Sequence, residues 1–200
     1  FPLGGFSKDE IRKMAYDRGY EELSKKAESY EICFVPDNDY RGFLKRRIPD
    51  LEASVAGGKF VDVRGNILGE HEGYPFYTIG QRKGLGTAFG KPMYVTAIQA
   101  DTNTVVLGEV EDLMRNGMTV RGVNLMKYDH IPEGLEVITQ VRYNDKGTMS
   151  VIHKQDDDKL QVEFYADVKG IAPGQSAVFY EGDDVVGGGI IHSALDLPKL

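Results

Sequence analysis

The stretch SAVFYEGDDVVGGGII, residues 176–191, decides the fold class because it carries two strand-like runs joined by a polar turn. Residues 176–180 and 185–191 are rich in the β-branched and aromatic residues that favour strands, and residues 181–184 supply the turn. The same texture recurs upstream in four further runs: residues 118–125, 135–143, 149–153 and 160–165. Strands of this length at this spacing predict a small β-barrel or sandwich at the C-terminal end.

The middle of the chain is also predicted to be β. Residues 59–63, a turn at 64–66 and residues 67–69 have the pattern of a hairpin. Three further strands are expected in this part: residues 76–79, 93–98 and 105–107. Residues 109–116 are the least regular segment, which indicates a boundary. We therefore expect three regions: residues 1–36, a central β-rich domain at 37–113 and a C-terminal barrel at 114–200.

Two short helices are predicted before the β regions. Ser7 and Glu10 have the spacing of a capping box, and Gly19 is a suitable residue to end the helix that follows. A second helix is expected over residues 39–47. Its N-terminal neighbour, residues 32–35, has the composition of a short strand. The fold class is therefore mainly β with a few short helices, and the last residues, 193–200, are expected to fray.

Composition sets limits on the class of protein. The formal net charge of −7 means that nucleic-acid binding cannot be argued from overall charge, although a local basic face is still possible. No apolar run is long enough to span a bilayer and the first residues do not resemble a signal peptide, so we expect a cytoplasmic protein. One cysteine excludes an internal disulfide, and the four scattered histidines offer no metal site.

Cys33 is the residue with the clearest potential for chemistry, and two interpretations stay open. A cysteine inside an apolar run is usually an inert core residue. Pro36 and a polar stretch nevertheless surround this run, and Lys25 and Lys26 would lower the pKa of the thiol if the fold brought them near. Such a thiolate would be a nucleophile.

Two further segments carry polar residues in unusual positions. Gly80, Gly84 and Gly86 indicate tight bends around Arg82 and Lys83, which could meet a phosphate, but no helix follows to strengthen that interpretation. Near the C-terminus, Arg142 and Tyr143 follow a strand and Gln175 follows a Pro-Gly turn. Turns and a hairpin explain the glycines at 187–189 well but leave Gln175 unexplained.

The segments SYEICF (residues 29–34) and YTIGQRKGLG (residues 77–86) resemble the C-terminal part of tRNA-specific 2-thiouridylases. The opening FPLG and the Lys8, Glu10, Arg12 pattern fit the same family, and the resemblance covers nearly all 200 residues in the family's order. The family's N-terminal phosphate loop and its first catalytic cysteine have no counterpart in this sequence. The resemblance therefore implies a fragment that is inactive by itself.

The resemblance also implies roles for particular residues. Cys33 would carry sulfur as a persulfide, delivered by a donor protein, to C2 of the wobble uridine in a tRNA anticodon loop. ATP would be the co-substrate, bound by the N-terminal domain, with no cofactor on this segment. Arg142, Tyr143 and Gln175 would contact tRNA from a barrel resembling that of elongation factors. Of the loop residues, Arg82 or Lys83 would meet a tRNA phosphate.

Two alternatives come from other classes of protein. A pure RNA-binding module, with Cys33 structural, predicts that replacing Cys33 changes stability but not function. A β-rich cysteine redox protein predicts a reactive thiol without tRNA affinity. The order of the motifs argues against both.

Overall fold

A computed structural model describes residues 2–26, 35, 37, 39–86, 89–156 and 158–198. The chain divides into two compact units, residues 1–50 and 51–200. Most of the described residues of the second unit lie in strands, which confirms the expected fold class. No helix among the described residues has the length and apolar character that crossing a membrane requires. The strand expected at 32–35 lies, except for Val35, outside the described residues.

The described residues of the first unit form three short helices: α1 (Lys8–Asp17), α2 (Glu21–Lys25) and α3 (Tyr40–Arg47). The predicted capping box of α1 is present, because the Ser7 N–H donates to the Glu10 carboxylate at 2.7 Å and the Glu10 N–H donates to the Ser7 hydroxyl. Gly19, with φ of +83°, follows the end of α1 as expected. Asp39 begins α3 by accepting the Gly42 N–H at 2.8 Å.

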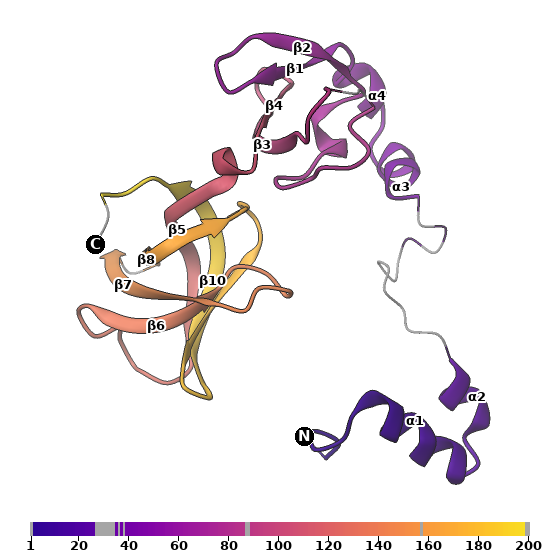
Figure 1. Ribbon diagram of the computed structural model, residues 1–200, viewed down its shortest axis with the longest axis vertical. Helices are drawn as coiled ribbons and strands as arrows, with labels where there is room; N and C mark the ends of the chain where they lie inside the picture. Colours follow the sequence, from indigo (N-terminus) through magenta and orange to yellow (C-terminus); the bar gives the residue numbers. More distant parts are fainter. Residues whose placement is uncertain are drawn as a thin grey trace. The chain divides into compact units, whose positions relative to one another are not determined.

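The second unit begins with α4 (Leu51–Ser54) and a four-stranded sheet (Figure 1). Its strands lie in the order β2-β1-β4-β3, and β1 and β4 are parallel while the other pairs are antiparallel. The bounds are β1 (Gly58–Asp62), β2 (Ile67–His71), β3 (Tyr94–Gln99) and β4 (Thr104–Gly108). The predicted hairpin is therefore confirmed. Phe60 is fully buried at the centre of the sheet, with its ring edge-on to those of His71 and Tyr77.

The prediction of a strand over residues 76–79 is wrong. A 3-10 turn, η1 (Tyr74–Phe76), ends at the first of these residues, and the rest of the segment does not pair with a strand. Pro75 has no N–H for a ladder, and the positive φ angles of Gly73 and Gly80 bend the chain at both ends. Phe76 and Tyr77 are buried in the core, and this burial explains the aromatic residues of the segment without a strand.

The remaining strands form a closed six-stranded barrel, which confirms the barrel prediction (Figure 1). A short 3-10 turn, η2 (Glu111–Leu113), precedes it. The strand order around the barrel is β10-β5-β8-β7-β6-β9, and β9 closes it by pairing with β10. The bounds are β5 (Met114–Leu125), β6 (Leu135–Gln140), β7 (Thr148–Asp156), β8 (Lys159–Lys169), β9 (Ser176–Glu181) and β10 (Asp184–Leu195).

The barrel has its own apolar core. Inward residues of all six strands contribute buried side chains, and among the largest fully buried ones are Met118, Ile152, Phe179 and Ile191. Thr139 and Ser150 are the buried polar pair of neighbouring strands, and their hydroxyls are hydrogen-bonded at 2.6 Å. Alternation along each strand therefore directs a second set of side chains outward.

The expectation that the chain frays from residue 193 is wrong for the described residues. β10 continues to Leu195, and its last residues pair with β5. Beyond the strand, the Leu197 N–H donates to the Asn116 side chain, whose amide donates back to the Leu197 carbonyl, both at 2.8 Å. A side chain added at Gly117 would meet Leu197 at 2.4 Å, so this glycine provides the space in which Leu197 packs.

Candidate functional site

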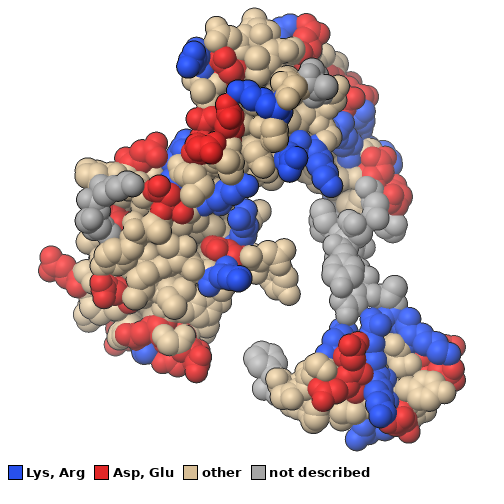
Figure 2. All heavy atoms as spheres, in the orientation of Figure 1, with Lys and Arg blue, Asp and Glu red and all other residues tan. Residues whose placement is uncertain are grey.

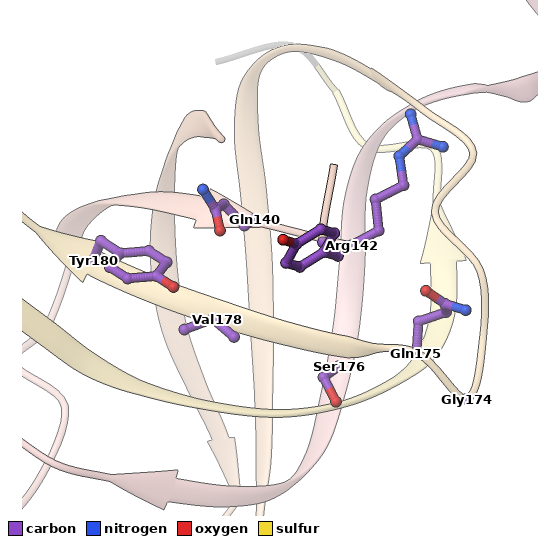
Figure 3. A pocket seen from close by; sticks show the side chains of 8 residues that line it. Gln140, Arg142, Gly174, Gln175, Ser176, Val178 and Tyr180 are labelled. Atoms are coloured by element: carbon purple, nitrogen blue, oxygen red, sulfur yellow. The ribbon is translucent and has the colours of Figure 1, made fainter. Parts of the chain in front are cut away.

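A cavity of about 610 Å³ opens on the outer surface of the barrel where β6 ends and β9 begins (Figure 3). It brings together all three barrel residues that the sequence singled out, although Gln175 lies more than thirty positions after Arg142 and Tyr143. The complete lining is Gln140, Arg142, Tyr143, Gly174, Gln175, Ser176, Val178 and Tyr180. Its contributions come from two neighbouring strands and from the turns at their ends.

Strand alternation explains which side chains reach this surface. In β6, Val137 and Thr139 are buried inside the barrel, so Gln140 faces outward. In β9, Ala177 and Phe179 are buried, so the residues between and beside them face outward. β6 and β9 are antiparallel neighbours, with Gln140 opposite Val178 and Ile138 opposite Tyr180. The two strands therefore present one continuous outer face.

The turn that carries Arg142 and Tyr143 is held by Asp145. Its carboxylate accepts the Val141 N–H at 3.0 Å and the Gly147 N–H at 3.2 Å, and its own N–H donates to the Arg142 carbonyl. This bracing fixes the backbone while leaving the Tyr143 side chain 98% exposed. An aromatic ring held almost wholly in solvent is available for contact with a partner.

The second turn is tied to β10. Gly174, with φ of +88°, donates its N–H to the Ile191 carbonyl at 2.9 Å, and the Ile191 N–H donates to the Gln175 carbonyl at 2.8 Å. The positive φ suits glycine at this position. Because both backbone bonds reach β10, the Gln175 amide projects from a fixed position.

The cavity is locally basic. Of the described residues that line it, Arg142 is the one with a formal charge, and none is a carboxylate. Among the described residues, the side chains of Arg142, Tyr143 and Gln175 have no hydrogen-bond or ion-pair partner. The face drawn in Figure 2 shows acidic and basic side chains intermingled. An arginine in a cavity whose described lining holds no carboxylate suits an anion.

Arg82 and Lys83 lie in the first part of the second unit, on the glycine-rich loop. Both are exposed, and Arg82 lines a separate cavity of about 480 Å³ that Lys83 does not line. Gln81 holds the loop in place: its side-chain oxygen accepts the Thr78 N–H and its amide donates to the Lys83 carbonyl, both at 3.0 Å. The loop is therefore a fixed support for two exposed cations.

Cys33 lies outside the described residues. Of the two lysines that could lower its pKa, Lys25 donates to the Glu21 carboxylate one turn earlier in α2, and Lys26 is exposed. No group of three or more metal-ligating side chains occurs in the described part of the chain.

Gln140, Ser176 and Tyr180 share the barrel cavity with the expected residues but were not among the expected site residues. Gln140 lies two positions before Arg142 and Ser176 follows Gln175, so spacing along the strands could have found these two. Tyr180 lies four positions after Ser176 on the same face of β9, so alternation places it on this surface only once Ser176 is known to be there. Finding the cavity also requires knowing that β6 and β9 are neighbouring strands, and alternation along a strand does not give the strand order.

Known proteins and protein families match nearly the whole length of the chain. Three family models match in order: a tRNA methyl transferase HUP domain at residues 1–37, a tRNA methyl transferase PRC-barrel domain at 41–109 and an aminomethyltransferase beta-barrel domain at 115–191. Among curated proteins, the tRNA-specific 2-thiouridylase MnmA of Amoebophilus asiaticus is 57% identical over 98% of the chain. Its counterparts in Cytophaga hutchinsonii and Salinibacter ruber are 59% and 48% identical over 97% and 96% of the chain. The chain spans about half the length of these relatives, 52%, 53% and 50%.

Proposed function

Because the chain belongs to the tRNA-specific 2-thiouridylase family, we propose that it is the sulfur-carrying and tRNA-binding part of an enzyme that thiolates C2 of the wobble uridine in tRNA. The proposed regions are residues 1–36, 37–113 and 114–200. The names of the relatives favour thiolation over the methyl transfer in two family descriptions, because those relatives match nearly the whole chain.

The observation that carries the proposal is the convergence of Arg142, Tyr143 and Gln175 on one cavity. The three residue types suit RNA: a guanidinium pairs with phosphate, an exposed aromatic ring stacks on a base or ribose, and an amide both donates and accepts hydrogen bonds. The Asp145 carboxylate and backbone hydrogen bonds hold the turns that carry them, so these residues would meet tRNA with little loss of conformational freedom.

Arg82 or Lys83 is proposed as a second contact with tRNA phosphate. Both side chains are exposed on a loop that Gln81 holds in place, and each would add a charge-assisted contact without sequence information.

Cys33 is proposed as the sulfur carrier, on the strength of its sequence motif and of the family. The uridine C2 oxygen is first adenylated with ATP, which turns it into a leaving group. The terminal sulfur of a Cys33 persulfide attacks C2, a carbon–sulfur bond forms, and AMP leaves with the C2 oxygen. A second cysteine thiolate then attacks the Cys33 sulfur, which releases 2-thiouridine and leaves a disulfide between the two cysteines. An external thiol reductant restores both thiols.

This sequence of steps assigns parts of the chemistry to other protein segments. The chain has one cysteine, so the second thiolate comes from outside these 200 residues. ATP would bind to a HUP domain of which residues 1–37 match only a part. We also propose a persulfide donor protein as a partner and the cytoplasm as the place of action.

The tRNA interface is tested by measuring binding of the 200-residue chain to unmodified tRNA at several salt concentrations. Arg142→Ala should weaken binding and lower the salt dependence by about one phosphate contact. Arg121→Ala, an exposed arginine on β5 outside the cavity, is the matched control. If Arg142→Ala and Arg121→Ala bind tRNA with the same affinity and salt dependence, the barrel cavity is not part of the tRNA interface.

The role of Cys33 is tested by joining the chain to the N-terminal part that its relatives carry, with Cys33 intact or as Cys33→Ser. The proposal expects 2-thiouridine to disappear from tRNA with serine while folding and tRNA binding persist. Near-normal thiolation would make Cys33 structural and the chain an RNA-docking module. A reactive thiol without tRNA affinity would favour a redox protein.

A further inference from the structure

Gln140 and Tyr180 are among the residues that line the barrel cavity but are not used by the proposed tRNA contacts. We propose that they form a slot for a single unstacked nucleobase of the bound RNA, so that this site contacts a base as well as the phosphate backbone. The inference rests on the proposed tRNA-binding function and specifies what the site holds.

The strand register places the two residues on the same outer face. Gln140 is opposite Val178, and Tyr180 is two positions further along β9, so the pair is diagonal. Diagonal neighbours on one face of antiparallel strands lie within reach of aromatic and long side chains. Val178, half-buried and directly opposite Gln140, gives the slot an apolar floor. Figure 3 shows Gln140 and Tyr180 on the side of the cavity away from Gln175.

The four tyrosines of the barrel divide into two with a bonded hydroxyl and two without such a bond among the described residues. Tyr128 donates to the Glu181 carboxylate at 2.8 Å, and Tyr165 donates to the Glu136 carboxylate. Neither of them lines the cavity. Tyr143 and Tyr180, which do, have no hydrogen-bond partner for their hydroxyls within the described residues. Water satisfies such groups on any surface, but here the two unbonded phenols and the unbonded amide of Gln140 share one cavity.

The chemistry of the lining fits a nucleotide. A base needs an apolar or aromatic contact for its face and a donor–acceptor pair for its edge, which Tyr180 and the Gln140 amide provide. Its phosphate needs a cation, and Arg142 stands at the same cavity without a neighbouring carboxylate in the lining. A volume of about 610 Å³ lies within the usual range of roughly 300–1,000 Å³ for small-molecule sites.

The chain contains no tryptophan, which allows a direct test. Tyr180→Trp introduces a single fluorescent reporter into the slot, and Tyr165→Trp places the matched control on β8 outside the cavity. Unmodified tRNA should quench Tyr180→Trp through base stacking and leave Tyr165→Trp unchanged. Heparin, a polyanion without bases, should leave both unchanged even where it displaces tRNA.

Binding measurements on further variants complete the test. Tyr180→Ala should weaken tRNA binding about 5- to 100-fold, in the range of one lost base–aromatic stack, while Tyr180→Phe keeps most of the affinity. Gln140→Leu should weaken binding while preserving the packing of the strand. Circular dichroism separates these effects from unfolding.

The outcomes distinguish the two proposals. If Arg142→Ala weakens binding but tRNA does not quench Tyr180→Trp and Tyr180→Ala binds normally, the slot is overturned and the tRNA interface stands. If the unmodified chain does not bind tRNA at all, the proposed function of the barrel fails with it. Quenching by heparin equal to that by tRNA would also overturn the slot, because it would report charge alone.

Discussion

The barrel and the four-stranded sheet are held together by different means. The barrel closes on itself around a continuous apolar core, and its polar site lies entirely on its surface. The sheet is open, and side chains brace its connections to the backbone: the Asn103 amide donates to the Val55 carbonyl at 2.7 Å and its oxygen accepts the Tyr74 N–H at 3.3 Å. The sheet also buries apolar side chains, among them Phe60 and Val95, and side chains such as Asp145 brace turns of the barrel as well. The difference that remains is closure, which gives the barrel a continuous inner core and leaves its outer face to carry exposed binding residues.

The largest effects are expected from the central aromatic residue of each region. Phe179→Ala in the barrel and Phe60→Ala in the sheet each remove a fully buried ring and should cost about 3–5 kcal/mol of unfolding free energy. Urea denaturation gives the total cost, and amide hydrogen exchange shows where protection is lost. We expect the loss to be confined to the region that carries the substitution. Loss of protection in both regions from either variant would mean that they unfold as one unit.

A pair of strand glycines gives the next contrast. A side chain added at Gly188 in β10 would lie 2.5 Å from the Ala177 carbonyl oxygen, so Gly188→Ala should cost about 1–3 kcal/mol. A Cβ added at Gly69 in β2 would have no other atom within 4 Å, so Gly69→Ala should stabilise the chain by about 0.5–1 kcal/mol. Thermal unfolding measures both. A neutral Gly188→Ala would show that the barrel wall can move apart.

His71 should make the sheet sensitive to acid. Its ring is buried, Nδ1 accepts the Gly73 N–H at 3.0 Å, and Nε2 has no partner among the described residues. Burial lowers the pKa of His71 below its ordinary value, although the backbone of Asn103 and Lys59 partly opposes the shift. Since the unfolded chain then binds the proton more readily, this stability is fully present above about pH 6.5 and decreases as the pH falls towards the folded-state pKa.

The measurement is the urea midpoint at about pH 7.5 and about pH 5.5, for the unmodified chain and for His71→Gln. Each unit by which the pKa is lowered corresponds to about 1.4 kcal/mol. The variant should show a smaller decrease between the two conditions. An equal decrease in both chains would assign the acid sensitivity to other groups.

The smallest effect is expected from the surface ion cluster of the barrel. Lys127 contacts the carboxylates of Glu181 and Asp184 at 2.5 and 2.7 Å, and hydrogen bonding to both raises the pKa of the lysine. Lys59 has one partner, Glu70, on the sheet. Lys127→Met should lower the melting temperature slightly more than Lys59→Met. The decrease in melting temperature caused by each substitution should vanish at about 1 M salt, where the screening length is about 3 Å. Persistence at that salt concentration would indicate lost packing of the lysine stem.

Local patterns were predicted well from the sequence. The capping box at Ser7 and Glu10 and the hairpin that begins at residue 58 depend on residues close together in the chain, and both are present. The segment after Gly73 was mistaken for a strand because buried aromatic residues satisfy the same local pattern in a strand and in an irregular core segment. The fixed C-terminal residues were missed because Asn116, their partner, lies about eighty positions away.

The sequence by itself determined the β character, the family and the residue types of the site. Arg142, Tyr143 and Gln175 came from motif resemblance, and their tRNA roles stay a prediction. Only the tertiary structure decided that these residues share a cavity, and that Gln140 and Tyr180 share it with them. The physical reason is that alternation fixes which side of a strand a residue faces, while the choice of neighbouring strand comes from closing the barrel around its core.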